Sequence, residues 1–210
     1  GWIGLEVAAA ARTHGAEVTL IEIAELPLVG VLGEDVARVF ADLHREHGVD
    51  LRLGTGVREI IGDNGRVVAV VTSDGDEIMA DTVVVGIGIT PRTELAADAG
   101  LAIEDGVAVD AGFRTSDPDI YAAGDVAAIE NRFVGGRVRV EHWANALDGG
   151  PAAARSMMGK DVVWDKPPFF FTDQYDLGME YIGHAPRGSY DDVVLRGDVA
   201  GRTFQAFWLR

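Results

Sequence analysis

Two glycines, Gly1 and Gly4, lie three residues apart at the start of the chain, and an alanine-rich apolar segment follows them directly. Apolar residues recur at helical spacing in that segment, so we predict a helix over residues 3–14 that ends at Gly15. Residues 17–23 are then predicted to form a buried parallel strand with Val18, Leu20 and Ile21 inside. A glycine turn, a helix and a strand in this order constrain the fold to an α/β unit.

The glycine turn and the acidic residue that ends the next strand together predict a nucleotide site. Glycines before a helix let the backbone approach a pyrophosphate, which then faces the amide groups of the first helical turn. Gly1, Ile3 and Gly4 would be the last part of a GxGxxG turn, so we expect the chain to begin inside this motif. Glu22 follows about 20 residues on, where a carboxylate accepts both ribose hydroxyls of an adenosine and repels a 2′-phosphate. NADH is therefore favoured over NADPH. The alternative is that no nucleotide binds here, and that the glycines only allow a close helix contact while Glu22 is simply exposed.

In the rest of the first half, the spacing of apolar residues is first that of a helix and then that of strands. We predict a helix over residues 34–47 and a strand over residues 49–53. A meander follows, with strands predicted at residues 57–62, 66–72 and 77–80, joined by hairpins at Asn64-Gly65 and Asp74-Gly75. Residues 82–86 are suited to a central parallel strand, which completes a Rossmann-like unit with an antiparallel insert.

The second half has weaker signals. We predict short strands at residues 107–109 and 120–122, and a helix at residues 145–158 that Pro151 can kink. Residues 166–168, Lys-Pro-Pro, form a linker, and residues 203–209 have the pattern of a strand.

Two later turns place glycines after predicted strands. Gly86 and Gly88 would leave room for a flat ligand at the carboxyl end of the sheet, although a loop that needs positive φ would contain the same residues. Gly124 and Asp125 follow another strand. An aspartate there can accept hydrogen bonds from sugar or ribityl hydroxyls, but a Gly-Asp turn is common and proves little alone.

An acid, an imidazole and an indole stand in a row at Glu141, His142 and Trp143. The indole can stack beside a flat cofactor or fill a core, and a structural role is favoured for His142 over that of a proton donor. Phe171, in a run of three phenylalanines, is predicted from these residues alone to belong to the core, with a flavin contact as the less favoured alternative. The other histidines lack metal-ligand spacing and are predicted at the surface or at helix caps: His14, His44, His47 and His184.

Charge and composition limit the partners. The formal net charge of −16 argues against nucleic acid or an acidic membrane as the main partner. Arg132, Arg137 and Arg139 could form a local basic patch for an acidic partner, although a solvated loop is the favoured reading. No apolar run approaches the roughly 20 residues that cross a bilayer. The chain has no cysteine, and the cytoplasm is the default location.

Together these residues resemble the FAD-dependent ferredoxin reductases of bacterial oxygenase systems, within the pyridine nucleotide-disulfide oxidoreductase superfamily. The matching motifs occur in order along nearly the whole chain, at residues 1–6, 20–22, 47–49, 83–88, 114–118, 120–125, 141–143, 145–146 and 171–176. The last groups distinguish it from the disulfide reductases, whose C-terminal domain carries a His-Glu pair. The chain departs from the family at two places. The loop at residues 25–28 lacks the arginines that often steady NADH, and Phe171 stands where a tryptophan is common.

The resemblance implies an α/β fold with three parts. These are a Rossmann-like NADH domain with an antiparallel hairpin insert (residues 1–106, without its first strand), the returning part of an FAD domain (107–165) and the start of a small α+β C-terminal domain (166–210). It also implies that the chain is truncated at both ends and that this piece alone is inactive.

The resemblance further implies an electron path from NADH through FAD to a ferredoxin- or rubredoxin-like iron–sulfur protein. By carry-over, Glu6 would hold the nicotinamide end of NADH and Glu22 its adenosine ribose. Gly124 and Asp125 would hold the ribityl-phosphate part of FAD. The segment with Glu141, His142 and Trp143 would lie where the nicotinamide meets the flavin. The cofactors carry the chemistry, so no catalytic side chain and no metal site are expected.

Two alternatives remain. One is an NADH-dependent disulfide or peroxide reductase of the same superfamily, whose redox cysteines would lie outside these residues. The other is a non-catalytic module in which NADH binding drives association.

Overall fold

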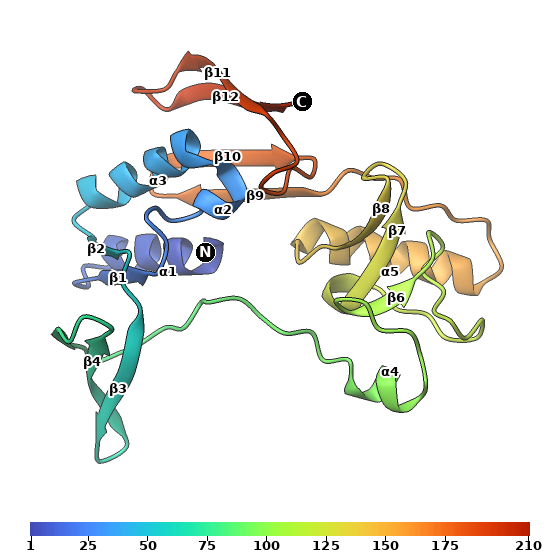
Figure 1. Ribbon diagram of the computed structural model, residues 1–210, viewed down its shortest axis with the longest axis horizontal. Helices are drawn as coiled ribbons and strands as arrows, with labels where there is room; N and C mark the ends of the chain where they lie inside the picture. Colours follow the sequence, from blue (N-terminus) through green and yellow to red (C-terminus); the bar gives the residue numbers. More distant parts are fainter. The chain divides into compact units, whose positions relative to one another are not determined.

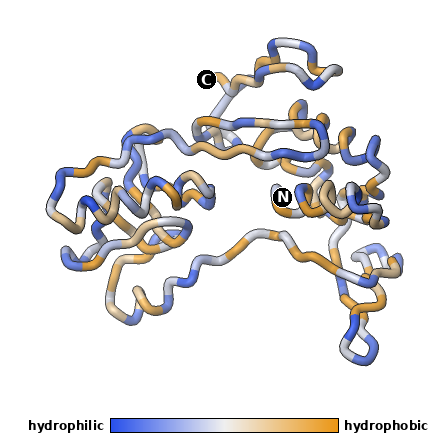
Figure 2. The backbone as a smooth tube through the Cα atoms, turned by 180° about the vertical axis from the view of Figure 1, so that it is seen from behind, coloured by the Kyte–Doolittle hydropathy of each residue, from blue (hydrophilic) through white to orange (hydrophobic).

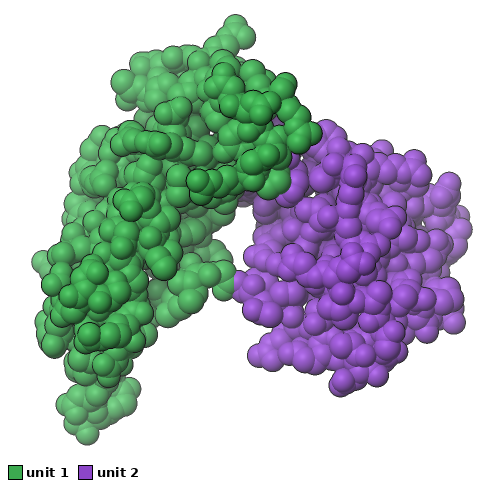
Figure 3. All heavy atoms as spheres, in the orientation of Figure 1, with its two compact units in different colours: residues 1–88, 172–178, 185–210 green, residues 89–171, 179–184 purple.

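The computed structural model describes all 210 residues, and they form two compact units (Figure 3). Unit 1 contains residues 1–88, 172–178 and 185–210. Unit 2 contains residues 89–171 and 179–184. The chain therefore leaves unit 1 after residue 88, returns to it for residues 172–178, leaves again for residues 179–184 and ends in it.

Unit 1 begins with the predicted α/β unit (Figure 1). Its elements are α1 (Trp2–Thr13), β1 (Thr19–Glu22), α2 (Val29–Leu32), α3 (Glu34–Glu46) and β2 (Asp50–Leu53). β1 and β2 run parallel, with Thr19 opposite Asp50 and Glu22 opposite Leu53. The predicted helices and parallel strands are confirmed, but β1 is half-buried rather than fully buried, because β2 is its only strand neighbour.

Helix α3 shows how the sequence sets this local structure. Acidic Glu34 and Asp35 lie in its first turn, where they complement the positive end of the helix dipole. Val36, Phe40 and Leu43 face the core, as the period predicts. The prediction of a surface or cap position is wrong for His44, which is 0% exposed, because it lies one turn after Phe40 on the same apolar face.

The antiparallel insert is also confirmed. It consists of β3 (Val57–Asp63), β4 (Arg66–Thr72) and β5 (Glu77–Met79), in the order β3-β4-β5. Asn64 and Gly65, with φ of 49° and 79°, have the two positive φ angles that a two-residue hairpin turn requires.

The predicted central strand at residues 82–86 is wrong. The segment is extended, but no strand of the chain pairs with it, and Val84 and Val85 are exposed. Figure 2 shows this apolar segment after the insert. A β-strand needs a hydrogen-bonded neighbour, so apolar character alone does not make one here.

Unit 2 packs one long helix against a small mixed sheet. Its elements are α4 (Glu94–Asp98), β6 (Val107–Val109), the 3₁₀ turn η1 (Gly124–Val126), β7 (Ala127–Asn131), β8 (Gly136–Arg139) and α5 (Trp143–Met157). β6 runs parallel to β7, and β8 runs antiparallel to it. The core contains Phe113, Ile129, Ala152 and Trp164. Helix α5 is confirmed and contains Pro151.

The strand predicted at residues 120–122 is only a single bridge between Tyr121 and Arg114. Its flanking residues turn too sharply for a ladder, since Ile120 donates its backbone N–H back to the carbonyl of Asp117.

Two hairpins complete the chain. β9 (Phe169–Gln174) pairs with β10 (Leu177–Ile182), and residues 172–178 of this hairpin belong to unit 1. β11 (Asp192–Asp198) pairs antiparallel with β12 (Thr203–Leu209), the strand predicted near the end. None of the helices combines the length and apolarity needed to cross a bilayer.

Candidate functional site

The first turn of α1 and the end of β1 lie next to each other in unit 1. Gly1 is the N-cap of α1, and the first turn contains no acidic residue. Glu22 ends β1, and its Oε2 atom lies 3.5 Å from the amino nitrogen of Gly1. Its Oε1 atom accepts a hydrogen bond of 3.2 Å from the backbone N–H of Ala24. An anion-attracting helix terminus thus borders a fixed carboxylate that can accept hydroxyl hydrogen bonds.

The other predicted residues of unit 1 border the same turn. A Cβ atom on Gly86 would lie 3.4 Å from the backbone nitrogen of Gly4, and one on Gly1 would lie 3.6 Å from the carbonyl oxygen of Gly86. A Cβ atom on Gly4 would meet no atom within 4 Å, and Ile3 is exposed. Gly88 has φ of 100° and open space beside it. Glycines therefore keep the turn and the extended segment in contact while the surface over Gly4 remains open.

Glu6, on the next turn of α1, has a partner that sequence reasoning did not assign to the site. Its Oε1 atom accepts a hydrogen bond from the hydroxyl of Thr172. Thr172 in turn accepts a bond of 3.1 Å from Nε2 of Gln174, whose Oε1 atom lies 2.9 Å from Nε2 of His44. The helical period of α3 places His44 on the apolar face and could have identified it. Thr172 and Gln174 lie in the family motif at residues 171–176, but no local signal connects them to Glu6.

Gly124 and Asp125 form the turn η1 in unit 2. Gly124 has φ of 76°, in the left-handed region that favours glycine, and a Cβ atom there would lie 3.8 Å from Cβ of Ala146 in α5. The Asp125 side chain is exposed at the first turn of η1. Its carboxylate is therefore available to hydroxyl groups of a ligand.

Glu141 and His142 precede α5 and differ in environment. Glu141 is exposed, and its Oε1 atom accepts a hydrogen bond of 2.6 Å from Nη1 of Arg139. His142 is the N-cap of α5, and its ring lies 4.7 Å from that of Phe170. Burial lowers the pKa of His142, and the carboxylates of Asp125 and Glu141 oppose this shift without overcoming it. The ring is therefore neutral at pH 7, and its Nδ1 atom is buried without a partner.

Trp143 and Phe171 form an exposed aromatic pair. Their ring centroids are 6.4 Å apart at an interplanar angle of 79°. Trp143 is 70% exposed and Phe171 is 50% exposed, so the prediction that Phe171 belongs to the core is wrong. In β9 exposure alternates from this point, with Phe171 exposed and Thr172 buried, because successive side chains of a strand point to opposite faces. Exposed indole and phenyl faces suit a flat ligand.

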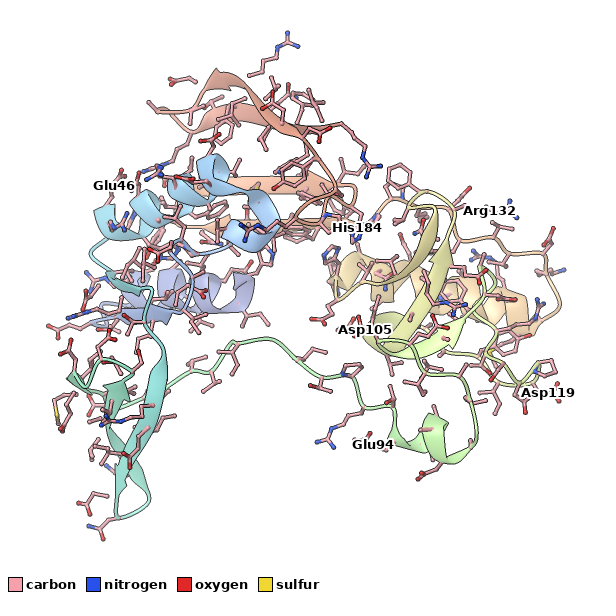
Figure 4. All side chains as sticks on the ribbon, in the orientation of Figure 1. Glu46, Glu94, Asp105, Asp119, Arg132 and His184 are labelled. Carbon is pink, nitrogen blue, oxygen red and sulfur yellow. The ribbon has the colours of Figure 1, made fainter.

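Of the three arginines considered for a basic patch, Arg137 and Arg139 are paired with acidic side chains, and Arg132 is exposed. Arg137 pairs with Glu104 at 2.7 Å and with Glu130 at 2.9 Å. Arg139 is nearly buried and pairs with Glu141 and with Asp105, which Figure 4 labels near β6. The acidic partners neutralise these cations locally.

The chain belongs to the pyridine nucleotide-disulphide oxidoreductase family, whose model matches residues 1–150. A reductase C-terminal model matches residues 169–210. The predicted α/β fold class is confirmed by these matches and by the solved structures that share the fold.

Individual relatives point to one group within the family. The chain is 44% identical to the ferredoxin reductase subunit of 5,5′-dehydrodivanillate O-demethylase from a Sphingobium species, covering 100% of the chain and 51% of that protein. It is 41% identical to rhodocoxin reductase of Rhodococcus erythropolis, covering 99% of the chain and 48% of that protein. Both proteins are reductases, which confirms the resemblance noted from the motifs.

A solved structure agrees with these relatives. Putidaredoxin reductase, in its covalent complex with putidaredoxin, aligns with a TM-score of 0.93 and 37% identity over 100% of this chain and 50% of that chain. The chain therefore spans about half the length of the relatives it matches.

Proposed function

We propose that this chain is part of an NADH-dependent flavoprotein reductase. It would pass electrons through FAD to a ferredoxin- or rubredoxin-like iron–sulfur protein that feeds an oxygenase or a cytochrome P450. The similarity to ferredoxin reductases over the whole chain carries this proposal. We also propose the cytoplasm as its location.

The residues of unit 1 fit an NADH site. The open surface over Gly4 admits a pyrophosphate to the amides of the helix terminus. Glu22, 20% exposed and held by the N–H of Ala24, would accept the adenosine ribose hydroxyls. Glu6 would receive the nicotinamide end. The remaining members of this site would be Gly1, Ile3, Gly86 and Gly88.

The residues of unit 2 fit a flavin site. The positive φ of Gly124 gives the backbone a close approach, and the exposed Asp125 would accept ribityl hydroxyls. Trp143 and Phe171 would supply apolar faces beside a flat ring, with Glu141 and His142 next to them. When bound, FAD supplies the conversion between two-electron and one-electron transfer. The residues of the chain itself would bind the flavin, orient it and shield it from solvent.

We further assign residues 1–106 to the NADH domain, residues 107–165 to the returning part of the FAD domain and residues 166–210 to the C-terminal domain. The βαβ arrangement at residues 19–53 supports the first assignment, and the reductase C-terminal match at residues 169–210 supports the third.

The test is an NADH oxidation assay of the purified flavin-loaded protein with two acceptors, cytochrome c and a small disulfide. We expect rapid reduction of cytochrome c only when a ferredoxin is added, and slow turnover of a small disulfide. Faster turnover of the disulfide would favour the disulfide reductase alternative. A protein that binds NADH but reduces neither acceptor would instead favour the binding module.

A further inference from the structure

A buried chain of polar side chains runs from α3 to the exposed carboxylate of Glu6, all within unit 1. His44, Gln174 and Thr172 are each buried, and Gln174 lies 130 residues from His44 in sequence. This chain of side chains is linked by three interactions. His44 contacts Gln174, Gln174 donates to Thr172, and Thr172 donates to Glu6. Buried polar groups at this density are costly unless they are paired, so the arrangement needs an explanation.

The hydrogen bonds in this chain share one direction. Thr172 has a single hydroxyl proton and gives it to the carboxylate of Glu6. Its oxygen can then only accept, and it accepts from the amide nitrogen of Gln174. The amide oxygen of Gln174 therefore faces His44, which must donate from Nε2.

The environment of His44 fixes that direction. Its other nitrogen, Nδ1, is buried without a partner, and a bare acceptor nitrogen is less costly there than an unpaired N–H. Burial lowers the pKa of His44, with a smaller contribution from His47, while the bond to Gln174 opposes the shift. His44 is therefore neutral with its proton on Nε2, and every donor in the chain points toward Glu6.

We propose that Thr172, Gln174 and His44 are positioning residues that hold the Glu6 carboxylate so that its second oxygen accepts the carboxamide N–H of nicotinamide. This inference rests on the proposed function. Only one Glu6 oxygen is engaged by Thr172, and the side chain is exposed, so the other oxygen is available to a ligand. A fixed acceptor selects an amide, which donates, and rejects a carboxylate, which would repel it.

The test replaces the hydroxyl of Thr172 in the flavin-loaded protein. Thr172→Val keeps the shape but removes the donor to Glu6, and Thr172→Ser restores it. Loss of one hydrogen bond to a charged group predicts about a ten-fold rise in KM for NADH with little change in kcat. ADP-ribose, which lacks nicotinamide, should bind the variant within about two-fold of the unchanged protein, because such a difference is under 0.5 kcal/mol.

Thr72→Val is the matched control. Thr72 is also a buried strand threonine, and its hydroxyl accepts the backbone N–H of Asp76 in the insert. It should lower stability without changing the KM for NADH. If Thr172→Val does not retain flavin, Thr172→Ala removes the same donor without a misplaced methyl group and is expected to raise the KM likewise.

Two results would count against these ideas, and they are distinguishable. An unchanged KM for NADH in Thr172→Val, together with a raised KM in Glu6→Gln, would overturn the positioning role and leave the NADH site intact. Failure of the unchanged protein to bind both ADP-ribose and NADH would overturn the proposed function itself.

Discussion

The rings of His47 and Tyr175 stack face to face, with centroids 3.7 Å apart and an interplanar angle of 12°. His47 is the C-cap of α3, and its Nδ1 atom lies 2.9 Å from the carbonyl oxygen of Leu43. Tyr175 is at the turn between β9 and β10, with φ of 57°. The stack therefore fixes the tip of the returning hairpin on the end of a helix made more than a hundred residues earlier.

Tyr175 provides a graded test of this contact. Its hydroxyl oxygen is buried without a hydrogen-bond partner, so Tyr175→Phe should leave the free energy of unfolding unchanged or raise it. Tyr175→Ala should lower it by about 3 kcal/mol, because the ring and its packing are lost. Urea unfolding of both variants measures these differences. A phenylalanine variant as unstable as the alanine variant would show that the hydroxyl is paired after all.

His44 makes the stability of the protein depend on pH. Its pKa is lower in the folded chain than the ordinary value of 6.5, mainly because of burial. Below about pH 6.5 the unfolded chain therefore binds a proton that the folded chain does not, and stability falls as the pH decreases. The slope from one such group is at most about 1.4 kcal/mol per pH unit.

The control for this effect is His44→Gln, which keeps a donor toward Gln174 but does not titrate. Unfolding at pH 7.5 and pH 5.5 should show a smaller acid loss in the glutamine variant than in the unchanged protein. Equal losses would mean that other groups, such as His142, account for the acid sensitivity.

Glu22 should determine the choice between NADH and NADPH. Glu22→Ala combined with Ala24→Arg removes the repulsion of a 2′-phosphate and adds a cation near it. We expect the ratio of kcat/KM for NADPH to that for NADH to rise by about ten-fold or more, a change of 1.4 kcal/mol. The measurement is steady-state kinetics with both nucleotides. An unchanged ratio would remove Glu22 from the ribose site.

Asp125 should contribute to flavin retention. Asp125→Ala removes the exposed carboxylate of η1, and loss of a hydrogen bond to a charged group weakens binding by about 1.5–3 kcal/mol. The flavin-to-protein absorbance ratio after gel filtration should fall. Asp119→Ala, at another exposed turn of unit 2 that Figure 4 labels, should retain its flavin. Equal flavin content in the two variants would argue against the proposed role.

The sequence predicts the elements whose signals are local. Helix α3 has a clear apolar period and acidic residues in its first turn, and the Asn64-Gly65 turn predicts its hairpin. Residues 82–86 show the limit, because apolar character does not supply the paired neighbour that a strand needs. Strand β7 is not predicted because its apolar and polar residues do not alternate. Its apolar part ends at the polar residues Glu130 and Asn131.

The candidate site likewise has one part that local sequence predicts and one part that it does not. The turn at Gly1 and Gly4 and the carboxylate of Glu22 are about 20 residues apart, a spacing that the βαβ unit itself sets. The chain of hydrogen-bonded side chains from His44 to Glu6 depends on residues 172–174, which return to unit 1 from far along the sequence. No local pattern encodes that return, so Thr172 and Gln174 emerge as site residues only in three dimensions.

The return of residues 172–178 to unit 1 has a consequence during translation. At about 5–20 residues per second, the ribosome completes α3 on the order of ten seconds before Gln174, its partner 130 residues later, is made. During that interval His44 at the end of α3 lacks its hydrogen-bond partner, whereas Phe40 already has Trp2 beside it, and Ala37 and Ala41 already have Leu26. A premature stop before residue 172 would remove the partner of His44 and the ring that stacks on His47, so such truncated products should be less stable than the full chain.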